Sequence, residues 1–395
     1  MMRRPPAAPP SPLLDVLGAL WTLDVPAVGM AWSGALAGFC LGDGTVATGR
    51  AEWDGAPKLS PCEGGTMLTP ATLPQPPLTR LRVHKGACLA IGAQPGSARP
   101  GNTQPGGEFL TGGDDGVLAR TTEEGVTTVI ENYPGSWVDL VAAGNGGWSA
   151  AATGRKVRIW DSGASGTIVY NLDLPSSVSD LAFDASGKQL AIAHYHGVTI
   201  WTADAPARVL HTPGCPLSVA WSPDAAYVIC GLQENALHGW RLSDGGDIEM
   251  GGYPGQPRSL QFSRDGRLLA SSGSPRVVCW KFDPPGMGGL PMECGLANSR
   301  QPVSRVACHP HHPIIAAGYH NGAVLLCQPG TDDVLFVKGS TGGSVTALSW
   351  SVDGGRLAMA TQGGEIGLVA LPDVLFHFST TKGATAGRTQ PETAE

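Results

Sequence analysis

An internal repeat constrains the fold of this chain more than any other feature of its sequence. Phe183, Trp221, Phe262, Cys308 and Trp350 follow one another at intervals of about 38 to 46 residues. Each ends a short apolar segment that we predict to be a β-strand. Seven such segments are Ala27–Trp32, Ser136–Ala142, Ser177–Phe183, Leu217–Trp221, Pro257–Phe262, Val303–Cys308 and Ser344–Trp350. A period of this length indicates stacked supersecondary units.

Turns and further apolar runs follow each of these segments. Ser222-Pro223-Asp224 is one such turn, built from residue types that turn geometry favours. The next runs, such as Leu190–Ala193 and Ile314–Ala317, are apolar at every position rather than alternating. A strand with this pattern is buried on both faces, which predicts that each repeat lies between two neighbours.

An eighth repeat fits the long interval between Trp32 and Ala142. Its predicted strands are Ala87–Ile91, Glu108–Thr111 and Val117–Ala119. Two insertions rich in proline and glycine, Pro57–Pro77 and Ala93–Gly107, are expected to be surface loops. The units then start near residues 27, 84, 136, 177, 216, 257, 302 and 344. Seven units remain the alternative, because the second of the eight is split by an insertion.

Repeats of this length with three or four short strands are typical of β-propeller blades. The 56 glycines and 33 prolines agree with a turn-rich fold, and charged residues are only 15 % where about 25 % is usual. We predict an all-β protein with one propeller domain over residues 19–378. A proline-rich arm (1–18) precedes it and a disordered tail (379–395) follows. Either Leu20–Val25, which we favour, or Val374–Phe378 would complete the last blade.

Several predicted third strands end in tryptophan. Trp160-Asp161 and Trp53-Asp54 are the clearest pairs, and Trp201, Trp240 and Trp280 stand in degenerate versions. The second unit also places His84-Lys85-Gly86 before its first strand and Asp114-Asp115-Gly116 after its second. Over residues 19–373 the chain resembles the WD40-repeat family, in a bacterial-type form with degenerate repeats.

The resemblance implies structural roles and a binding face. His84, Asp115 and the strand-ending Trp53, Trp160, Trp201, Trp240 and Trp280 would belong to hydrogen-bonded networks, although no unit has the complete set. Partners of this family usually bind the face that carries the turns between second and third strands. Here those turns contain Asp43, Asp114, Asp115, Arg155, Tyr195, His196, Glu234, Asn235, His320 and Asn321. The alternative is that these residues only serve turn geometry.

The sequence contains no pattern that predicts catalysis. The richest cluster of metal-ligand residue types is Cys308-His309-Pro310-His311-His312. It occupies the turn after the first strand of its unit, whereas His320 lies beyond the next strand, at the opposite end of the blade. We therefore expect a structural turn, no metal site and no cofactor, and we predict that the protein is not an enzyme.

The remaining observations concern partner class and compartment. A net charge of −7 argues against nucleic-acid binding, and no apolar run is long enough for a transmembrane helix. Nine cysteines without a Cys-x-x-Cys pair indicate reduced thiols, and the early prolines argue against a signal peptide. We predict a monomeric cytoplasmic scaffold for an unidentified protein partner. The alternative is a small-ligand or metal-dependent enzyme or binding propeller, with Asp43, Asp115, His196, Glu234 and His320 at the channel mouth.

Overall fold

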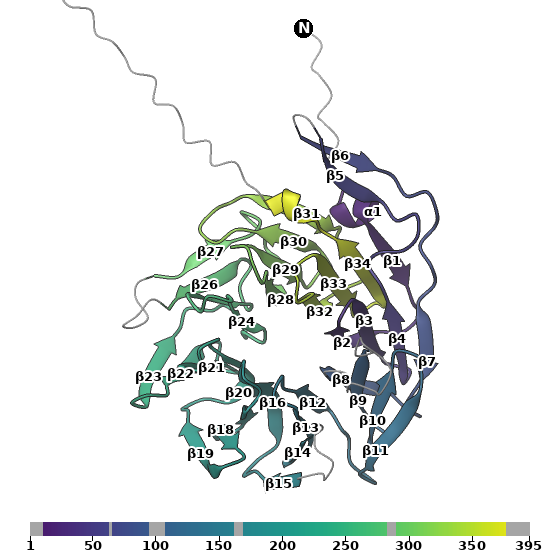
Figure 1. Cartoon of the computed structure of the whole chain (residues 1–395). Helices are drawn as coiled ribbons and strands as arrows, with labels where there is room; N and C mark the ends of the chain where they lie inside the picture. The colour runs from purple at the N-terminus through teal and green to yellow at the C-terminus, as the bar shows by residue number, and fades with distance from the viewer. Residues whose placement is uncertain (1–10, 63–64, 95–106, 162–168, 283–289, 377–395) are drawn as a thin grey trace, which may run out of the picture.

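Eight four-stranded antiparallel sheets form a ring in the computed structural model of the chain (Figure 1). The structure describes residues 11–62, 65–94, 107–161, 169–282 and 290–376. Successive first strands contact one another around the centre of the ring, including the pair formed by the last and the first. The predicted all-β propeller with eight blades is confirmed, and the alternative of seven blades is wrong.

The first and second strands of the blades form the inner half of the ring. The first strands of blades 1 to 8 are β2 (Ala27–Ser33), β8 (Cys88–Gln94), β12 (Leu140–Ala143), β16 (Val178–Phe183), β20 (Pro216–Trp221), β24 (Leu260–Phe262), β28 (Val303–Cys308) and β32 (Val345–Trp350). The second strands are β3 (Leu36–Leu41), β9 (Glu108–Gly113), β13 (Trp148–Thr153), β17 (Gln189–His194), β21 (Tyr227–Leu232), β25 (Leu268–Ser271), β29 (Ile315–Tyr319) and β33 (Arg356–Thr361).

The third and fourth strands form the outer half. The third strands are β4 (Thr45–Gly49), β10 (Val117–Thr122), β14 (Lys156–Asp161), β18 (Gly197–Thr202), β22 (Leu237–Arg241), β26 (Val277–Lys281), β30 (Val324–Cys327) and β34 (Glu365–Ala370). The fourth strands are β7 (Thr79–Arg82), β11 (Thr127–Asn132), β15 (Val169–Asp173), β19 (Ala205–His211), β23 (Gly246–Met250), β27 (Met292–Cys294), β31 (Val334–Lys338) and, in blade 8, β1 (Gly18–Thr22).

Burial follows the position of a strand within its blade. Every residue of β3, β9 and β29 is buried, because neighbouring blades cover both faces of these second strands. Outer strands such as β11 and β19 are exposed along much of their length. The continuous apolar runs of the sequence therefore correspond to strands enclosed between two sheets.

A β-bulge near the start of most first strands makes room for hydrogen bonds between blades. In β16, β28 and β32 the register shifts by one residue at Ser179, Ser304 and Thr346. Each of these hydroxyl groups donates to the carbonyl that begins the first strand of the next blade, at 2.7, 2.9 and 2.7 Å. In blade 5 Ser218, one position further along, donates at 3.2 Å to the Pro257 carbonyl, which precedes the first strand of blade 6. The Thr346 bond crosses the junction where the ring closes.

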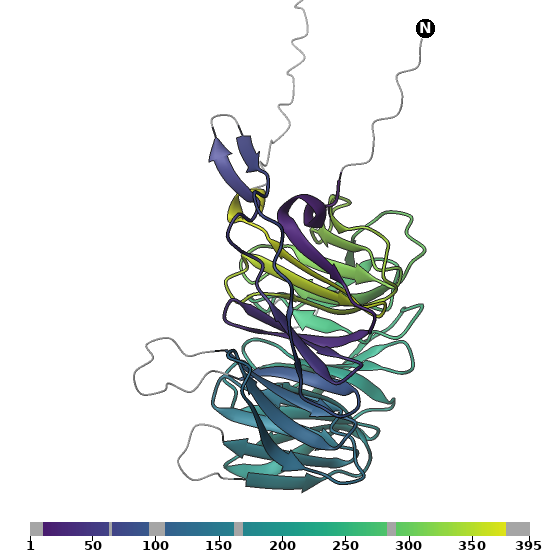
Figure 2. The same ribbon diagram turned by 90° about the vertical axis from the view of Figure 1, so that its right-hand side faces the viewer.

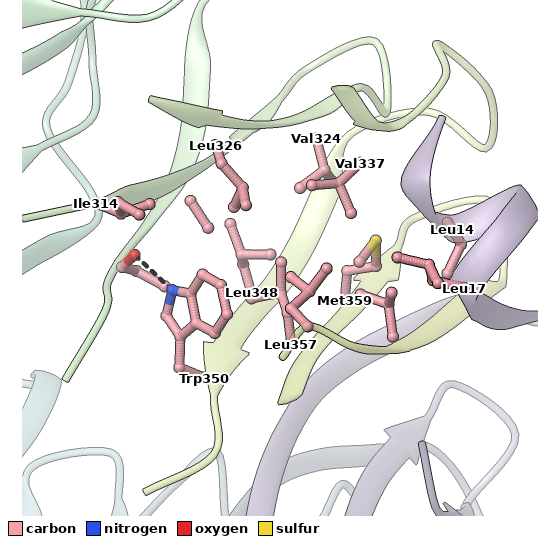
Figure 3. Close-up of a cluster of buried hydrophobic side chains, with 14 of the residues drawn as sticks. Leu14, Leu17, Ile314, Val324, Leu326, Val337, Leu348, Trp350, Leu357 and Met359 are labelled. Atoms are coloured by element: carbon pink, nitrogen blue, oxygen red, sulfur yellow. Dashed lines mark hydrogen bonds between the residues drawn. The ribbon is translucent and has the colours of Figure 1, made fainter. Parts of the chain in front are cut away.

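Tryptophans at the ends of first strands form a second set of bonds between blades. The indole Nε1 of Trp350 donates to the Ala307 carbonyl of the preceding blade at 3.1 Å (Figure 3). Trp221 donates in the same way to Ala182 at 2.9 Å. Trp32 does so to Ser349 at 3.0 Å, again across the closure. The repeat thus joins first and last blades with the same bonds that join other neighbours.

The N-terminal segment completes blade 8, as favoured from the sequence. The strand β1 pairs antiparallel with β34 over Gly18–Thr22, somewhat earlier than the predicted Leu20–Val25. A Cβ on Gly18 would lie 2.7 Å from the Leu368 carbonyl oxygen, so a larger residue would not fit there. The alternative segment does not form a strand, because Asp373–Phe376 is a 3₁₀ helix (η1) and residues 377–378 lie outside the described residues.

Gln75 and Pro76 hold β1 from its outer side. The Gln75 amide donates to the Leu20 carbonyl at 2.6 Å and accepts from the Leu20 N–H at 3.1 Å, as a neighbouring strand would. The Pro76 carbonyl accepts the indole N–H of Trp21 at 2.9 Å. A segment that follows the first insertion therefore supports the closing strand.

The predicted arm ends earlier than residue 18. Leu13–Leu17 form the short helix α1, and Leu14 and Leu17 are buried against blade 8. They join Trp350, Leu357 and Met359 in one apolar cluster (Figure 3). Burying a leucine side chain stabilises a fold by about 1.5–3 kcal/mol, so α1 contributes to closure. The tail at 379–395 lies outside the described residues.

The first insertion is not the plain surface loop that we expected. Residues Lys58–Cys62 (β5) and Gly65–Thr69 (β6) form an antiparallel hairpin. The hairpin extends away from the ring (Figure 2). The prediction also placed Trp53 at the end of a third strand, but β4 ends at Gly49 and the Trp53 indole donates to the Leu73 carbonyl at 3.2 Å. The second insertion lies largely outside the described residues. Over the described ranges, no helix is long and apolar enough to cross a membrane.

Candidate partner-binding face

One face of the ring carries the turns between second and third strands. Backbone hydrogen bonds join these turns to the segments that lead into first strands, for example from Val138 to Gly113 at 3.0 Å and from Val178 to Gly154 at 2.8 Å. We call the turns and these lead-in segments together the turn face. Because their backbones are bonded to each other, the face is a continuous and fixed surface.

The ten residues predicted for this face divide into two groups by exposure. The exposed group consists of Arg155, Tyr195, His196, Glu234 and His320. The half-buried group consists of Asp43, Asp114, Asp115, Asn235 and Asn321.

The half-buried group largely serves turn geometry. The Asp43 carboxylate accepts the Thr45 N–H at 3.0 Å and its hydroxyl at 2.6 Å. Asn321 accepts the Ala323 N–H at 3.2 Å in the corresponding turn of blade 7. Asn235 has φ +57°, a left-handed conformation that asparagine tolerates better than most residues. The side chains of Asp43 and Asn321 thus stabilise their own turns.

His84 and Asp115 belong to a buried network at the second blade. His84 Nδ1 lies 3.1 Å from Asp115 Oδ1, and its Nε2 lies 3.0 Å from the Thr111 hydroxyl. Asp115 also accepts the backbone N–H groups of Lys85 and Val117 at 2.9 and 3.1 Å. Burial opposes ionisation of this carboxyl, but these hydrogen bonds outweigh it and lower the pKa of Asp115. Sequence reasoning missed Thr111, whose position in an apolar strand gave no sign of its partner.

Trp137 is an exposed aromatic side chain that sequence reasoning also missed. The prediction placed it inside a first strand, but β12 begins at Leu140 and Trp137 lies in the segment before it. Its exposed fraction is 65 %, close to the 62 % of Tyr195 on the next blade. The Tyr195 ring meets the His196 ring edge to face at 5.1 Å. The turn sequence Pro134-Gly135-Ser136 before Trp137 is the signal that could have placed it in a loop.

The residues proposed for a small-ligand site at the channel mouth have internal partners. Glu234 accepts the Cys215 N–H at 2.9 Å, and Asp43 and Asp115 are bonded within their own turns as described above. His196 and His320 are exposed, but they belong to blades 4 and 7. Within the described ranges, no group of three or more His, Cys, Asp or Glu side chains is arranged to hold a metal ion.

The histidine-rich turn is organised around His309. Its Nδ1 accepts the backbone N–H groups of His311 and His312, both at 3.0 Å, and its Nε2 donates to the Gly354 carbonyl at 3.0 Å. Burial is the main cause that lowers the pKa of His309 to about 4. Both ring nitrogens are thus engaged by backbone. His312 pairs with Asp373, and His320 lies across β29 on the turn face.

Comparisons with known proteins show similarity of fold alone. No family model matches the sequence, and no curated protein matches it. Among solved structures, the chain is similar to the computationally designed Ika8 protein, with a TM-score of 0.65 and 14 % sequence identity. The match covers 90 % of this chain and 99 % of the designed one. At this identity the similarity shows the architecture of the ring and does not identify a family.

Proposed function

We propose that this chain is a degenerate WD40-type propeller that acts in the cytoplasm as a non-enzymatic platform for a protein partner. The observation that carries the proposal is the pair of exposed aromatic side chains on the turn face, Trp137 and Tyr195. Large aromatic residues dominate the energetics of protein interfaces because they bury much area with little loss of conformational entropy. The network of His84, Thr111 and Asp115 supports the WD40 assignment.

The backbone that carries both aromatics is fixed before any partner arrives. Next to Trp137, Val138 is fully buried and bonded to blade 2. Tyr195 donates its backbone N–H to the Ser176 hydroxyl at 2.9 Å. Its neighbour His194 is buried against Thr199. A preorganised surface loses little entropy on binding, which favours a docking role.

The exposed polar residues of the turn face suit a protein partner. Arg155, His196 and Glu234 supply exposed polar groups of both signs, as the rim of a protein interface does. A nucleic-acid partner would require a basic surface, whereas the chain carries a net charge of −7. We also propose that the chain is monomeric by itself, since closure of the ring leaves no blade incomplete.

The test compares a turn-face variant with a control on another turn. The tagged full chain, W137A/Y195A and V352A are recovered from lysate of the source organism, and co-purifying proteins and small molecules are quantified by mass spectrometry. Val352 is the control because it is 81 % exposed in a turn between a first and a second strand, at the opposite ends of strands from the turn face.

We expect one stoichiometric protein with the full chain and with V352A, reduced at least tenfold with W137A/Y195A. That loss corresponds to about 1.4 kcal/mol of binding free energy, a modest value for two aromatic anchors. Equal recovery with all three chains would contradict the assignment of the turn face. A retained metal or small ligand without a protein would favour the enzyme or ligand-binding alternative.

A further inference from the structure

Three buried cysteines meet at the junction of blades 6 and 7, away from the turn-face aromatics. Cys279 lies on β26, Cys294 on β27 and Cys327 on β30, and all three belong to one buried cluster. The Cys327 thiol donates to Cys294 with an Sγ–Sγ distance of 3.1 Å. This contact could not be predicted from the sequence, because the two residues are 33 positions apart in different blades.

The Cys294–Cys327 pair needs little movement to form a covalent bond. Two sulfur atoms in a disulfide lie about 2.05 Å apart, so the thiols must approach by roughly 1 Å. Both residues end strands of their blades, β27 and β30, and are 0 % and 2 % exposed. The backbones of β27 and β30 thus keep the two sulfur atoms close to each other.

The surroundings of Cys294 favour its thiolate form. Hydrogen bonds from Cys279 and Cys327 lower the pKa of Cys294, and the nearby Arg276 guanidinium lowers it further. The Nε of Arg276 is buried without a hydrogen-bond partner in the described part of the chain, 3.8 Å from the Glu293 carboxylate. The pKa of Cys327 is raised, chiefly because its thiol donates to Cys294. Since the thiolate is the nucleophile, Cys294 is the residue that reacts first.

A cavity lies against one member of the pair. Cys327 lines a cavity of about 360 Å³ together with Ile314, Leu326 and Val334. Hydrogen peroxide, a molecule little larger than water, fits such a space, whereas a bulky disulfide reagent would need the blades to separate. Cys294 is fully buried and does not line this cavity, so peroxide reaches its thiolate past Cys327.

We propose that Cys294 and Cys327 are a peroxide-sensitive pair that forms a disulfide between blades 6 and 7. The Cys294 thiolate attacks one peroxide oxygen, the O–O bond breaks, and Cys294 becomes a sulfenic acid while the departing hydroxide takes a proton to form water. Cys327 then attacks the sulfenic sulfur, loses its proton and expels a second water. Two thiols and one peroxide thus give one disulfide and two waters, and a small thiol reductant reverses the change.

A second cysteine pair in the chain provides an internal comparison. Cys40 and Cys88 are buried together between blades 1 and 2. The hydrogen bond with Cys40 and burial raise the pKa of Cys88, and the nearby charged neighbour is the acidic Asp115 rather than an arginine. We expect this pair to remain reduced under conditions that oxidise Cys294 and Cys327.

The experiment maps disulfides in the folded full chain after peroxide treatment. The C62S background removes the exposed Cys62, the thiol through which molecules would link most readily. After brief exposure to hydrogen peroxide, remaining thiols are alkylated in denaturant and peptides are mapped without reduction. We expect the Cys294–Cys327 peptide link in most molecules, its disappearance after dithiothreitol, and full alkylation of Cys40 and Cys88.

Variants separate the roles of the three thiols. In C327S the sulfenic acid should persist and be trapped on Cys294 by dimedone added together with denaturant, and in C294S neither the link nor a dimedone adduct should form. In C279A, the matched control, the link should still form, although more slowly because Cys294 loses a hydrogen bond. If C327S unfolds, C327A serves in its place. A Cys279–Cys294 link, or unmodified Cys294 in folded peroxide-treated protein, would overturn the proposal.

Discussion

Single side chains make the junctions between blades specific. The hydroxyl groups of Ser179, Ser304 and Thr346 and the indoles of Trp221 and Trp350 each reach a carbonyl of a neighbouring blade. A buried carbonyl without such a donor costs about 1–3 kcal/mol, so these bonds fix how adjacent sheets sit.

Removing one such hydroxyl should open the ring locally at the closure but not at other junctions. T346V deletes the bond to Ala27 and keeps the side-chain shape, whereas S179A deletes the equivalent bond to Pro216 within the continuous chain. We expect each variant to lose about 1 kcal/mol of unfolding free energy in urea. Only T346V should also open the ring locally, seen as faster amide exchange in β1 and β34. Identical exchange in the two variants would contradict a special role of the closure.

His309 should make stability depend on pH. Its pKa is about 4 when folded and about 6.5 when unfolded, so between these values the unfolded state binds more protons. Stability therefore falls as the pH drops from about 6.5 to about 4, by at most about 3 kcal/mol, and this contribution is constant above that window. H309S, which copies the serine of sister turns such as Ser222, should lack the dependence. Urea unfolding of the natural chain and of H309S at pH 7 and 4.5 measures this dependence. Equal losses of unfolding free energy in the two proteins would contradict the role of His309.

At the scale of elements, the first insertion combines a dispensable part and a supporting part. Among the described apolar side chains of the β5–β6 hairpin, Leu59 alone packs against the apolar cluster of blade 8, whereas Gln75 and Pro76 bond to β1. Insertions that extend from a surface are tolerated when few of their contacts reach the core.

Excision of the hairpin should therefore be tolerated. Replacing residues 58–69 by a short Gly-Ser link joins positions that are already paired, because Lys58 lies opposite Thr69. We expect the unfolding free energy to change by less than about 1 kcal/mol. Q75A should lose about 1–2 kcal/mol, since the Leu20 N–H and carbonyl lose their partner. Calorimetry of the two variants compares their stabilities. A larger loss on excision of the hairpin than in Q75A would contradict this prediction.

At the scale of the whole molecule, closure depends on the N-terminal segment. Deleting residues 1–26 removes the buried Leu14, Leu17 and Ala19 together with β1. Two buried leucines alone represent about 3–6 kcal/mol, against a typical domain stability of about 5–15 kcal/mol. We expect aggregation or a much lower melting temperature, whereas deletion of 379–395 should leave melting unchanged. Equal melting of the shortened and full chains would show that β1 is not needed for closure.

Repeat spacing and turn residues were enough to predict the blades, their number and the closing segment. The positions of strands depend mainly on local sequence, so aligned apolar runs such as Leu190–Ala193 were enough to locate them. The hairpin was not predicted because prolines and polar residues interrupt the apolar pattern by which a strand is recognised. Trp137, Thr111 and the Cys294–Cys327 contact escaped because exposure and pairing between blades depend on tertiary placement. The binding role of the turn face stays a prediction.

The pairing of β1 with β34 also sets the order of events during synthesis. A ribosome makes β1 more than 340 residues before its partner strand, which at about 5–20 residues per second is a delay of tens of seconds. Throughout that time Trp21 and its neighbours have no sheet to join, and blades 1 to 7 must form as an open arc. The N-terminal segment is therefore the part of the protein that needs a chaperone to cover its unpaired strand, and slower translation lengthens this period. The ring forms only when the last blade leaves the ribosome.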